Sequence, residues 1–426
     1  MKTTVLALGS RGDVQPAIAL GKALAGRGHD VRVLAGKSFA PWIAEHGLTA
    51  IPASVDSVDI MESDLGKQWV SRGTNPLVQS RVLQRIIGRF GAAMVDDALR
   101  ACEGAELILS SFTSDTYAAS IAEASGATQV SMPLQPSILA TRHGPTALAA
   151  PVPRRDSVLN LLFGKLFVEP TVWRWYGGVT NDVRRRLGLA PQRRRAYMAA
   201  LRRTLVVHGY SAHVVPHPGD WPPTFHTTGY WFLDEGQGGY RPPEALERFL
   251  AAGEPPIAVG FGSMTSHDAA ATTRILVDAV ARSGRRAVLL SGWAALGDTA
   301  LPNTILRIDA APHDWLYPRV AAAVIHGGAG TVAACLRAGR PPVVVPHLAD
   351  QLFWGRRVEE LGVGPRAIPR PRLTTEALAA AIEAATTDAG MRQRAEELGR
   401  KIRAEDGVGA AIAHIERRLD AHARAR

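Results

Sequence analysis

The hydrophobic residues of this chain occur in short runs that alternate with amphipathic stretches and glycine-containing turns. Near the start, the apolar run at 3–8 is followed by the polar turn GSRGD, an amphipathic stretch at 14–28 and a second apolar run at 30–36. Strand, turn, helix and strand in this order form a βαβ unit. The alternation predicts a parallel sheet with helices on both faces. It continues through segments at 104–111, 116–126, 127–132 and 204–209.

The alternation breaks off twice along the chain. Between about Leu134 and Arg195, prolines and aromatic residues replace the strand signals, with five aromatic residues from Phe163 to Tyr176. An insertion of this kind on an α/β frame commonly carries specificity, so we expect a substrate pocket there, with plain helical packing as the alternative. The segment 216–243 is dense in proline and glycine, which marks a boundary between folding units.

A second series of apolar runs follows this boundary, at 255–264, 285–292, 303–308, 321–330 and 341–347. The chain has 426 residues, more than one hydrophobic core usually holds. We therefore expect two α/β domains joined by a linker. The carboxyl ends of both sheets are expected to face a cleft between the domains, where ligand-binding turns from the two halves would meet.

The chain is strongly basic, with a formal net charge of +10 that comes mostly from arginine. Nucleic acid, an anionic membrane surface and ordinary solvated helix faces all suit such a charge. The sequence contains no helix-turn-helix, zinc-finger or aromatic-interleaved basic pattern, which argues against nucleic acid as a partner. Solvated helix faces are the default interpretation, and a weak peripheral membrane contact stays open.

The apolar runs are too short for a membrane span, which needs about 18 apolar residues. The nearest, at 158–170, is interrupted by glycine, lysine, glutamate and proline. The opening MKTTVLALGSRGD has the pattern of a buried strand rather than of a secretory signal. Cys102 and Cys335 are the only cysteines, which suggests neither a disulfide framework nor a zinc cluster. We expect a soluble protein of the reducing cytoplasm.

Two short glycine-rich turns each allow two interpretations. In GSRGDVQP at 9–16, Asp13 is suited either to cap the following helix or to act as a general base at the mouth of the cleft. In GFGSM at 260–264, Gly262 and Ser263 can offer a phosphate backbone N–H groups and a hydroxyl, or form a plain tight turn. Neither motif decides the matter alone.

The turn HGGAGT at 326–331 lies between two apolar runs. A strand that ends in glycines and opens a helix presents bare backbone N–H groups to a phosphate, at the positive end of the helix dipole. His326 can donate a hydrogen bond or a positive charge, while Gly328, Gly330 and Thr331 supply backbone and hydroxyl donors. The alternative is a core histidine beside a packing turn. The motif points to a nucleotide.

Shorter sequence motifs bear on whether the protein binds a sugar or a metal ion. Asp350 and Gln351 offer carboxylate and amide groups suited to the vicinal hydroxyls of a sugar, or to a helix cap. LAGKS at 34–38 has Val31 where a phosphate-binding P-loop requires glycine, and neither Asp-x-Asp nor His-Glu-x-x-His occurs. We expect chemistry without a metal ion.

Several segments together carry a resemblance to a known family. They are GSRGDVQP (9–16), GYSAHVVPHPGDWP (209–222), TTGYW (227–231), PPIAVGFGSM (255–264), SGW (291–293), APHDWLYPRVAAAVIHGGAGT (311–331) and DQLFWGRRVEELGVGP (350–365). In order and spacing they resemble the nucleotide-sugar-dependent glycosyltransferases of family 1. The closest branches are the sterol glucosyltransferase-like enzymes and the bacterial antibiotic glycosyltransferases. The resemblance runs from about residue 3 to the C-terminal region.

The resemblance implies a GT-B fold, an α/β architecture of two Rossmann-like domains that face each other across a cleft. An acceptor-binding domain is expected at 1–232, a nucleotide-sugar-binding domain at 233–400, and a C-terminal helix at 401–426 that crosses back to the first domain. The implied activity is that of an inverting hexosyltransferase. It moves a sugar from a UDP- or dTDP-sugar to a hydroxyl of a lipophilic acceptor such as a polyketide, a phenol or a sterol. The nucleotide stays open, as does the choice between monomer and homodimer.

The resemblance also implies site residues. Asp13 becomes the catalytic base, and no metal ion or cofactor takes part beyond the nucleotide-sugar co-substrate. The aromatic residues Phe163, Phe167 and Trp173 are expected to contact the acceptor. The donor-binding residues are expected to be Ser10, Arg11, Gly12, Ser263, Trp293, His313, His326, Gly328, Gly330, Thr331, Asp350 and Gln351.

Two other functions remain as rivals. A nucleotide-sugar epimerase shares the two-domain frame, although the HGGAGT and Asp-Gln arrangement speaks against it. A catalytically inactive relative can instead bind and activate a partner enzyme, but such proteins typically lack the base or the donor contacts. Because the base and the donor motifs are both present here, an enzyme is favoured.

Overall fold

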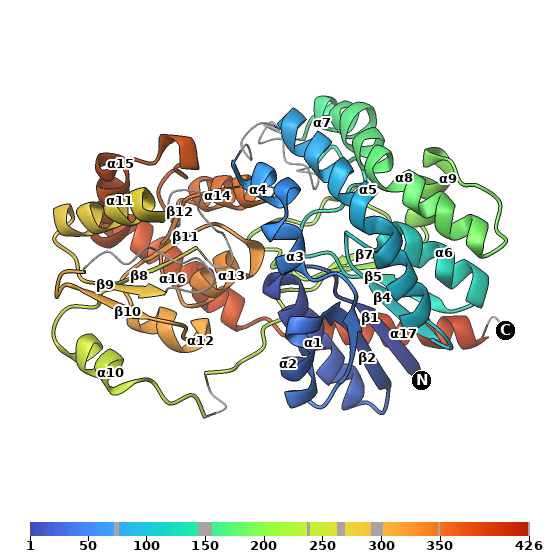
Figure 1. Cartoon of the computed structure of the whole chain (residues 1–426), viewed down its shortest axis with the longest axis horizontal. Helices are drawn as coiled ribbons and strands as arrows, with labels where there is room; N and C mark the ends of the chain where they lie inside the picture. Colours follow the sequence, from blue (N-terminus) through green and yellow to red (C-terminus); the bar gives the residue numbers. More distant parts are fainter. Residues whose placement is uncertain are drawn as a thin grey trace. The chain divides into compact units, whose positions relative to one another are not determined.

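Two parallel β-sheets with flanking helices organise the chain (Figure 1). The structure, a computed structural model, describes residues 1–71, 76–143, 156–236, 239–261, 269–290, 301–347 and 350–424. The chain divides into two compact units. Unit 1 holds Met1–Trp69, Pro76–Leu233 and Glu405–Arg426, and unit 2 holds Val70–Asn75 and Asp234–Ala404. The α/β class expected from the alternating apolar runs is confirmed.

The sheet of unit 1 has, among the described residues, seven strands in the order β3-β2-β1-β4-β5-β6-β7. Each adjacent pair is parallel, as the helical connections require. In the centre of the sheet, Val5 pairs with Val33 on one side and with Leu109 on the other. The strands span β1 Lys2–Leu6, β2 Asp30–Gly36, β3 Thr49–Ala53, β4 Leu107–Ser110, β5 Thr128–Ser131, β6 Leu205–His208 and β7 Phe225–Thr227.

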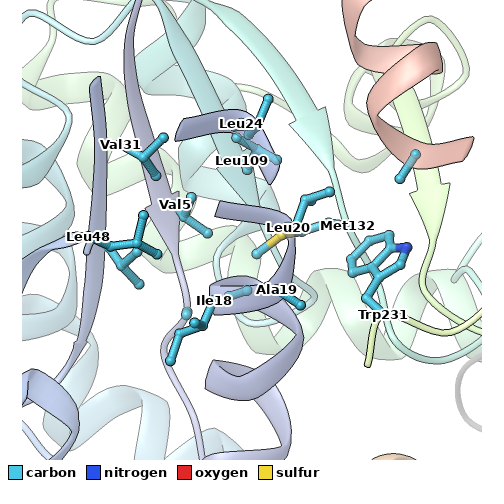
Figure 2. Packing of buried hydrophobic residues seen from close by; sticks show 14 of the residues in the cluster. Val5, Ile18, Ala19, Leu20, Leu24, Val31, Leu48, Leu109, Met132 and Trp231 are labelled. Atoms are coloured by element: carbon cyan, nitrogen blue, oxygen red, sulfur yellow. The ribbon is translucent and has the colours of Figure 1, made fainter. Parts of the chain in front are cut away.

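Helices cover both faces of this sheet. The long ones span α1 Arg11–Ala25, α5 Pro76–Ala101, α6 Asp115–Ser125, α8 Glu169–Arg186 and α17 Gly407–Arg424. Neighbouring strand residues pack against different helices because successive side chains point to opposite faces. Val5 and Leu109 meet α1 and α17 (Figure 2), whereas Leu6 and Ile108 meet α5, α6 and α8. This packing fixes the carboxyl ends of the strands, from which the loops of the site begin.

The insertion at 134–195 is mainly helical where the structure describes it. Helix α7 (Val158–Phe163) runs through a π-helical turn (Gly164–Val168) into α8, which packs against α5 and α6. Most of the described part of this segment is therefore a helical layer over the sheet. The other short helices of unit 1 span η1 Lys37–Phe39, α2 Ala40–Glu45, α3 Ser57–Glu62, α4 Asp64–Ser71 and α9 Arg194–Leu201.

Unit 2 repeats the design on a smaller scale, with a parallel sheet in the order β10-β9-β8-β11-β12. Its strands span β8 Ile257–Gly260, β9 Ala287–Leu290, β10 Ile305–Ile308, β11 Ala323–Ile325 and β12 Pro342–Val344. Its helices span α10 Glu244–Ala251, α11 Ala269–Arg282, α12 His313–Leu316, α13 Ala329–Arg337, α14 Gln351–Glu360, α15 Thr375–Thr387 and α16 Ala389–Arg403. The turns of interest follow β10, β11 and β12.

Apart from the short stretch Val70–Asn75, the chain passes from one unit to the other at two points. The first lies between Leu233 and Asp234, within the segment rich in proline and glycine, although that segment also supplies strand β7 and the buried Trp231 to unit 1. The second lies between Ala404 and Glu405, so α17 belongs to unit 1 and packs on α1. Within the described ranges, no helix combines the length and the apolarity that crossing a membrane requires.

Candidate active site

Asp13 lies in the first turn of α1, directly after strand β1. Its Oδ2 atom accepts hydrogen bonds from the backbone N–H of Ser10, at 2.8 Å, and from the Ser10 hydroxyl, at 3.3 Å. The carboxylate therefore closes the helix N-terminus, as the cap interpretation requires. Burial raises the pKa of Asp13, and the hydrogen bonds from Ser10 offset part of that rise. A raised pKa makes this carboxylate a stronger base than an ordinary aspartate.

The other residues of this turn are Ser10, Arg11 and Gly12, and Arg11 contacts the neighbouring helix α2. The guanidinium of Arg11 lies 4.5 Å from the ring centroid of Trp42 in α2, a cation–π contact. Gly12 is exposed, and a β-carbon there would make only ordinary contact with the Ser10 hydroxyl, at 3.6 Å. Ser10, Arg11 and Gly12 thus present one exposed turn at the carboxyl end of β1.

A second carboxylate, Asp115, occupies the same kind of position after strand β4. Its two oxygens accept hydrogen bonds from the hydroxyls of Ser110, at 2.6 Å, and Ser131, at 2.7 Å. Burial raises the pKa of Asp115 to about 7. The loop before it is tied to the Asp13 turn, since the Thr113 hydroxyl donates to the carbonyl of Leu8 at 3.0 Å. Sequence analysis missed Asp115, although a carboxylate after a strand and at a helix start was the available signal.

Asp115 also lines a small cavity of about 20 Å³, enough for a water molecule or one polar group. Most of the wall is apolar and comes from the ends of β4, β5 and β6 and from the helical layer. The lining residues include Phe112, Pro133, Ile138, Val172, Tyr197 and Leu201. The cavity thus sets one carboxylate, that of Asp115, in mainly apolar surroundings within unit 1.

In unit 2, the turn after strand β11 exposes the N-terminus of helix α13. Gly328 is the N-cap residue, no side chain caps the helix, and its first turn holds no acidic residue. Gly327 adopts φ of +92° in the left-handed region, and a β-carbon there would come within 2.5 Å of Val344. The backbone N–H groups of an uncapped first turn are ready donors for an anion.

His326 precedes these glycines and packs against them. A β-carbon on Gly328 would lie 2.5 Å from Nε2 of His326, so the glycine makes room for the imidazole. Burial, together with the nearby His347 and His313, lowers the pKa of His326 to about 3. Its Nδ1 atom is buried and has no partner among the described residues. His326 is therefore neutral at ordinary pH, and what it offers an anion is a hydrogen bond rather than a positive charge.

Asp350 and Gln351 are both anchored by neighbours that the sequence did not single out. The indole N–H of Trp354 donates to Oδ2 of Asp350 at 3.0 Å, and Trp354 is fully buried. The backbone N–H of His347 donates to Oε1 of Gln351 at 2.7 Å. The backbone carbonyl of Gln351 would lie 3.3 Å from a β-carbon on Gly327, which places this pair beside the His326 turn.

Other expected donor residues are less constrained. Gly330 faces open space, and Thr331 follows it in the first turn of α13. His313 stacks on Tyr317 with ring centroids 4.6 Å apart. Ser263 and Trp293 lie outside the described residues. The donor-binding roles of all these residues stay predictions. Among the described residues, no group of three His, Cys, Asp or Glu side chains lies close enough together to hold a metal ion.

The three residues expected to contact the acceptor separate into two places. Trp173 stacks on Tyr197 with centroids 5.6 Å apart and packs inside the helical layer. Phe163 and Phe167 stack on each other at 5.3 Å near the π-helical turn, where Phe167 is 60 % exposed. None of the three lines the cavity at Asp115, and their role with an acceptor stays a prediction.

Comparison with known proteins agrees with these local features. Residues 3–122 match the glycosyltransferase family 28 N-terminal domain, and residues 275–414 match the C-terminal domain of erythromycin biosynthesis protein CIII-like proteins. A sterol 3-beta-glucosyltransferase of Emericella nidulans is 36% identical over 442 residues. The match covers 99% of this chain and 30% of that protein, so the chain spans less than a third of the length of this curated relative.

Solved structures show the same fold over the whole chain. The glycotransferase of kitacinnamycin superposes with a TM-score of 0.70 at 20% identity, covering 98% of this chain and 99% of the other. The glycosyltransferase VinC, solved in complex with DTDP, gives a TM-score of 0.61 at 20% identity, covering 98% and 100%. With the two matching domains and the sterol glucosyltransferase relative, these likenesses identify the chain as a member of the family 1 GT-B glycosyltransferases of the sterol and antibiotic type.

Proposed function

We propose that this protein is an inverting glycosyltransferase that moves a hexose from a UDP- or dTDP-sugar to a hydroxyl of a lipophilic small molecule. The uncapped, glycine-rich N-terminus of α13 carries the proposal, because it offers several backbone donors and no competing acidic side chain. The DTDP complex of VinC supports a nucleoside diphosphate as the ligand. The sterol glucosyltransferase relative supports a lipophilic acceptor.

In the proposed reaction, Asp13 is the general base. One carboxylate oxygen takes the proton of the acceptor hydroxyl while the hydroxyl oxygen attacks the anomeric carbon of the donor sugar. The bond from that carbon to the diphosphate breaks on the opposite side, so the anomeric configuration inverts. Both hydrogen bonds from Ser10 fall on Oδ2 and neither falls on Oδ1. Oδ1 is the atom that we assign to the proton.

The leaving diphosphate gains negative charge as the bond breaks. We assign its stabilisation to the first-turn N–H groups of α13, the Thr331 hydroxyl and a hydrogen bond from neutral His326. Asp350 and the N–H donors of Gln351 are assigned to the hydroxyls of the sugar. These groups supply fixed dipoles where other enzymes use a metal ion, so the proposed reaction includes none and should continue in the presence of a chelator.

The decisive experiment separates the base from the cap at Asp13. Asp13→Asn keeps an oxygen that can accept the Ser10 N–H but removes the base. Asp59 in helix α3 gives a matched control, because its carboxylate accepts the N-cap N–H of Asp56 at 3.1 Å in the same way. We expect Asp13→Asn to lower kcat by roughly 10²- to 10⁴-fold with unchanged donor affinity. Asp59→Asn should leave both unchanged.

The assay tests UDP- and dTDP-sugars against a panel of lipophilic alcohols and phenols, with glycosides detected by mass spectrometry and donor binding by calorimetry. Glycoside of inverted configuration from the wild type supports the proposal. Equal, small losses in Asp13→Asn and Asp59→Asn would leave Asp13 only a cap. Nucleotide binding without transfer to any acceptor would favour the auxiliary-protein role, and conversion of the sugar without an acceptor would favour an epimerase.

A further inference from the structure

One short stretch of unit 1 exposes a row of large apolar side chains. We name it the apolar stripe and define it by Val158, Leu159, Leu162, Leu166 and Phe167, which are 50, 66, 45, 63 and 60 % exposed. Among the described residues, Met1 is the only other exposed large hydrophobic side chain. Single exposed apolar residues are ordinary, but a contiguous group marks an interaction surface.

The stripe exists because this helical segment points most of its large apolar side chains toward solvent. The buried residues of α7 and the π-helical turn are Asn160, Gly164 and Val168, while the three leucines of the stripe are exposed. A surface helix of a globular protein normally does the opposite. The orientation is held by hydrogen bonds, since the Asn160 amide donates to the carbonyl of Arg142 at 2.9 Å and the Ser157 N–H donates to the same carbonyl at 3.0 Å.

Positive charge accompanies the stripe. Lys165 lies within it and Arg174 follows two helical turns later on α8, and both are exposed. Neither makes a hydrogen bond or ion pair with another described residue. Two carboxylates that are close in the sequence are already engaged: Asp156 pairs with Arg142 and His143, both at 3.3 Å, and Glu169 accepts the backbone N–H of Ala140 at 3.3 Å. The two cations are thus free for an external anion, on a chain whose formal net charge is +10.

We propose that the apolar stripe docks on an anionic lipid bilayer. A helix that presents leucine and phenylalanine beside lysine and arginine lies in the plane of the interface, with its apolar side chains among the acyl chains and its cations at the phosphates. In Figure 1, α7 lies at the upper edge of unit 1, at the end of the helical layer. Docking would hold unit 1 at the surface in which a lipophilic acceptor dissolves, a consequence that rests on the proposed function.

The docking itself is tested without any glycosyl transfer. The full chain is mixed with phosphatidylcholine vesicles, with and without phosphatidylglycerol, and the bound fraction is measured by co-sedimentation. We expect binding that requires the anionic lipid and weakens as salt rises. Leu159→Ser combined with Leu166→Ser should lower the vesicle affinity by about tenfold or more. Its melting temperature should match the wild type, because both side chains are exposed.

The charged residues have their own variants. Lys165→Gln combined with Arg174→Gln should weaken binding to anionic vesicles, whereas Lys22→Gln, an exposed lysine on α1, should not. A wild-type chain that binds neither vesicle overturns the proposal. So does a wild-type chain that forms dimers dissolved by the leucine variant and ignores lipid, since the stripe would then join two copies. Because vesicle binding needs no donor or acceptor, failure of the proposed function would leave this result intact.

Discussion

Gly9 is a glycine because of Asp13: a β-carbon at position 9 would overlap Oδ2 of the Asp13 carboxylate. Gly9→Ala must therefore push the carboxylate away from Ser10 without changing its chemistry. If Asp13 is the base, we expect kcat to fall by about a hundredfold, because the proton acceptor is displaced. The measurement is kcat with donor affinity alongside it, and the control is Gly88→Ala, which adds a methyl group in open space on α5. Wild-type turnover in Gly9→Ala would count against Asp13 as the base.

Trp354 positions Asp350 through its indole N–H. Trp354→Phe keeps an aromatic ring and removes this donor, so the carboxylate is no longer held. We expect KM for the nucleotide-sugar to rise by about tenfold, the size of a lost hydrogen bond to a charged group, while affinity for the free nucleoside diphosphate stays the same. Trp175→Phe is the matched control, since it loses an indole hydrogen bond to Ser80 in unit 1. If both variants change KM equally, general destabilisation explains the effect.

Gly328 leaves the space that the His326 ring occupies. Gly328→Ala should displace the imidazole from the start of α13, and we expect affinity for UDP or dTDP to fall by about tenfold or more as the hydrogen bond to the diphosphate is lost. Calorimetry of the diphosphate alone measures this without any turnover. An unchanged dissociation constant would show that His326 does not hold the nucleotide.

Asp115 makes the stability of the fold depend on pH. Its pKa is about 7 in the folded chain against an ordinary value of 3.8, so between these values the folded state binds a proton that the unfolded state has released. The free energy of unfolding should therefore fall as pH rises through this window, by at most about 1.4 kcal/mol per pH unit. Asp115→Asn cannot ionise and should remove this part of the slope. Urea unfolding across this pH window measures the slope, and the exposed Asp30→Asn serves as control. If the free energies of unfolding of the wild type and Asp115→Asn changed in parallel with pH, that result would contradict the raised pKa of Asp115.

The sequence predicted the parts of the fold that depend on local pattern. The run at 30–36 is strand β2 residue for residue, and the HGGAGT turn does open a helix after a short strand. Strand β3 escaped notice because it is a half-exposed edge strand that contains Pro52. Strand β7 lies inside the segment interpreted as a boundary, where only its pairing with β6 makes it a strand. Non-local pairing of this kind leaves no periodic signal.

The site residues that belong to a sequence motif could be predicted. The residues that hold them in place could not, because their role depends on contacts in the folded chain. Asp13, Asp350 and the glycines of α13 stand in motifs, but their anchors Gly9 and Trp354 become visible only through contacts in space. Charge states also depend on burial. His326 appeared as a potential cation, yet the surrounding apolar packing and two histidines hold it neutral. Sequence gives residue types, whereas desolvation belongs to the folded chain.

The return of α17 to unit 1 sets the order in which this protein can be completed during synthesis. Ala411, Ile412 and Ile415 are fully buried in the same core as Ile18 and Leu20. A ribosome adds these residues only after it has made all of unit 2. Until then, the part of the unit 1 core that α17 covers stays exposed to solvent. Domains usually finish in the order of their appearance. Here unit 2 can be finished first, and α17, which is made after unit 2, completes the core of unit 1.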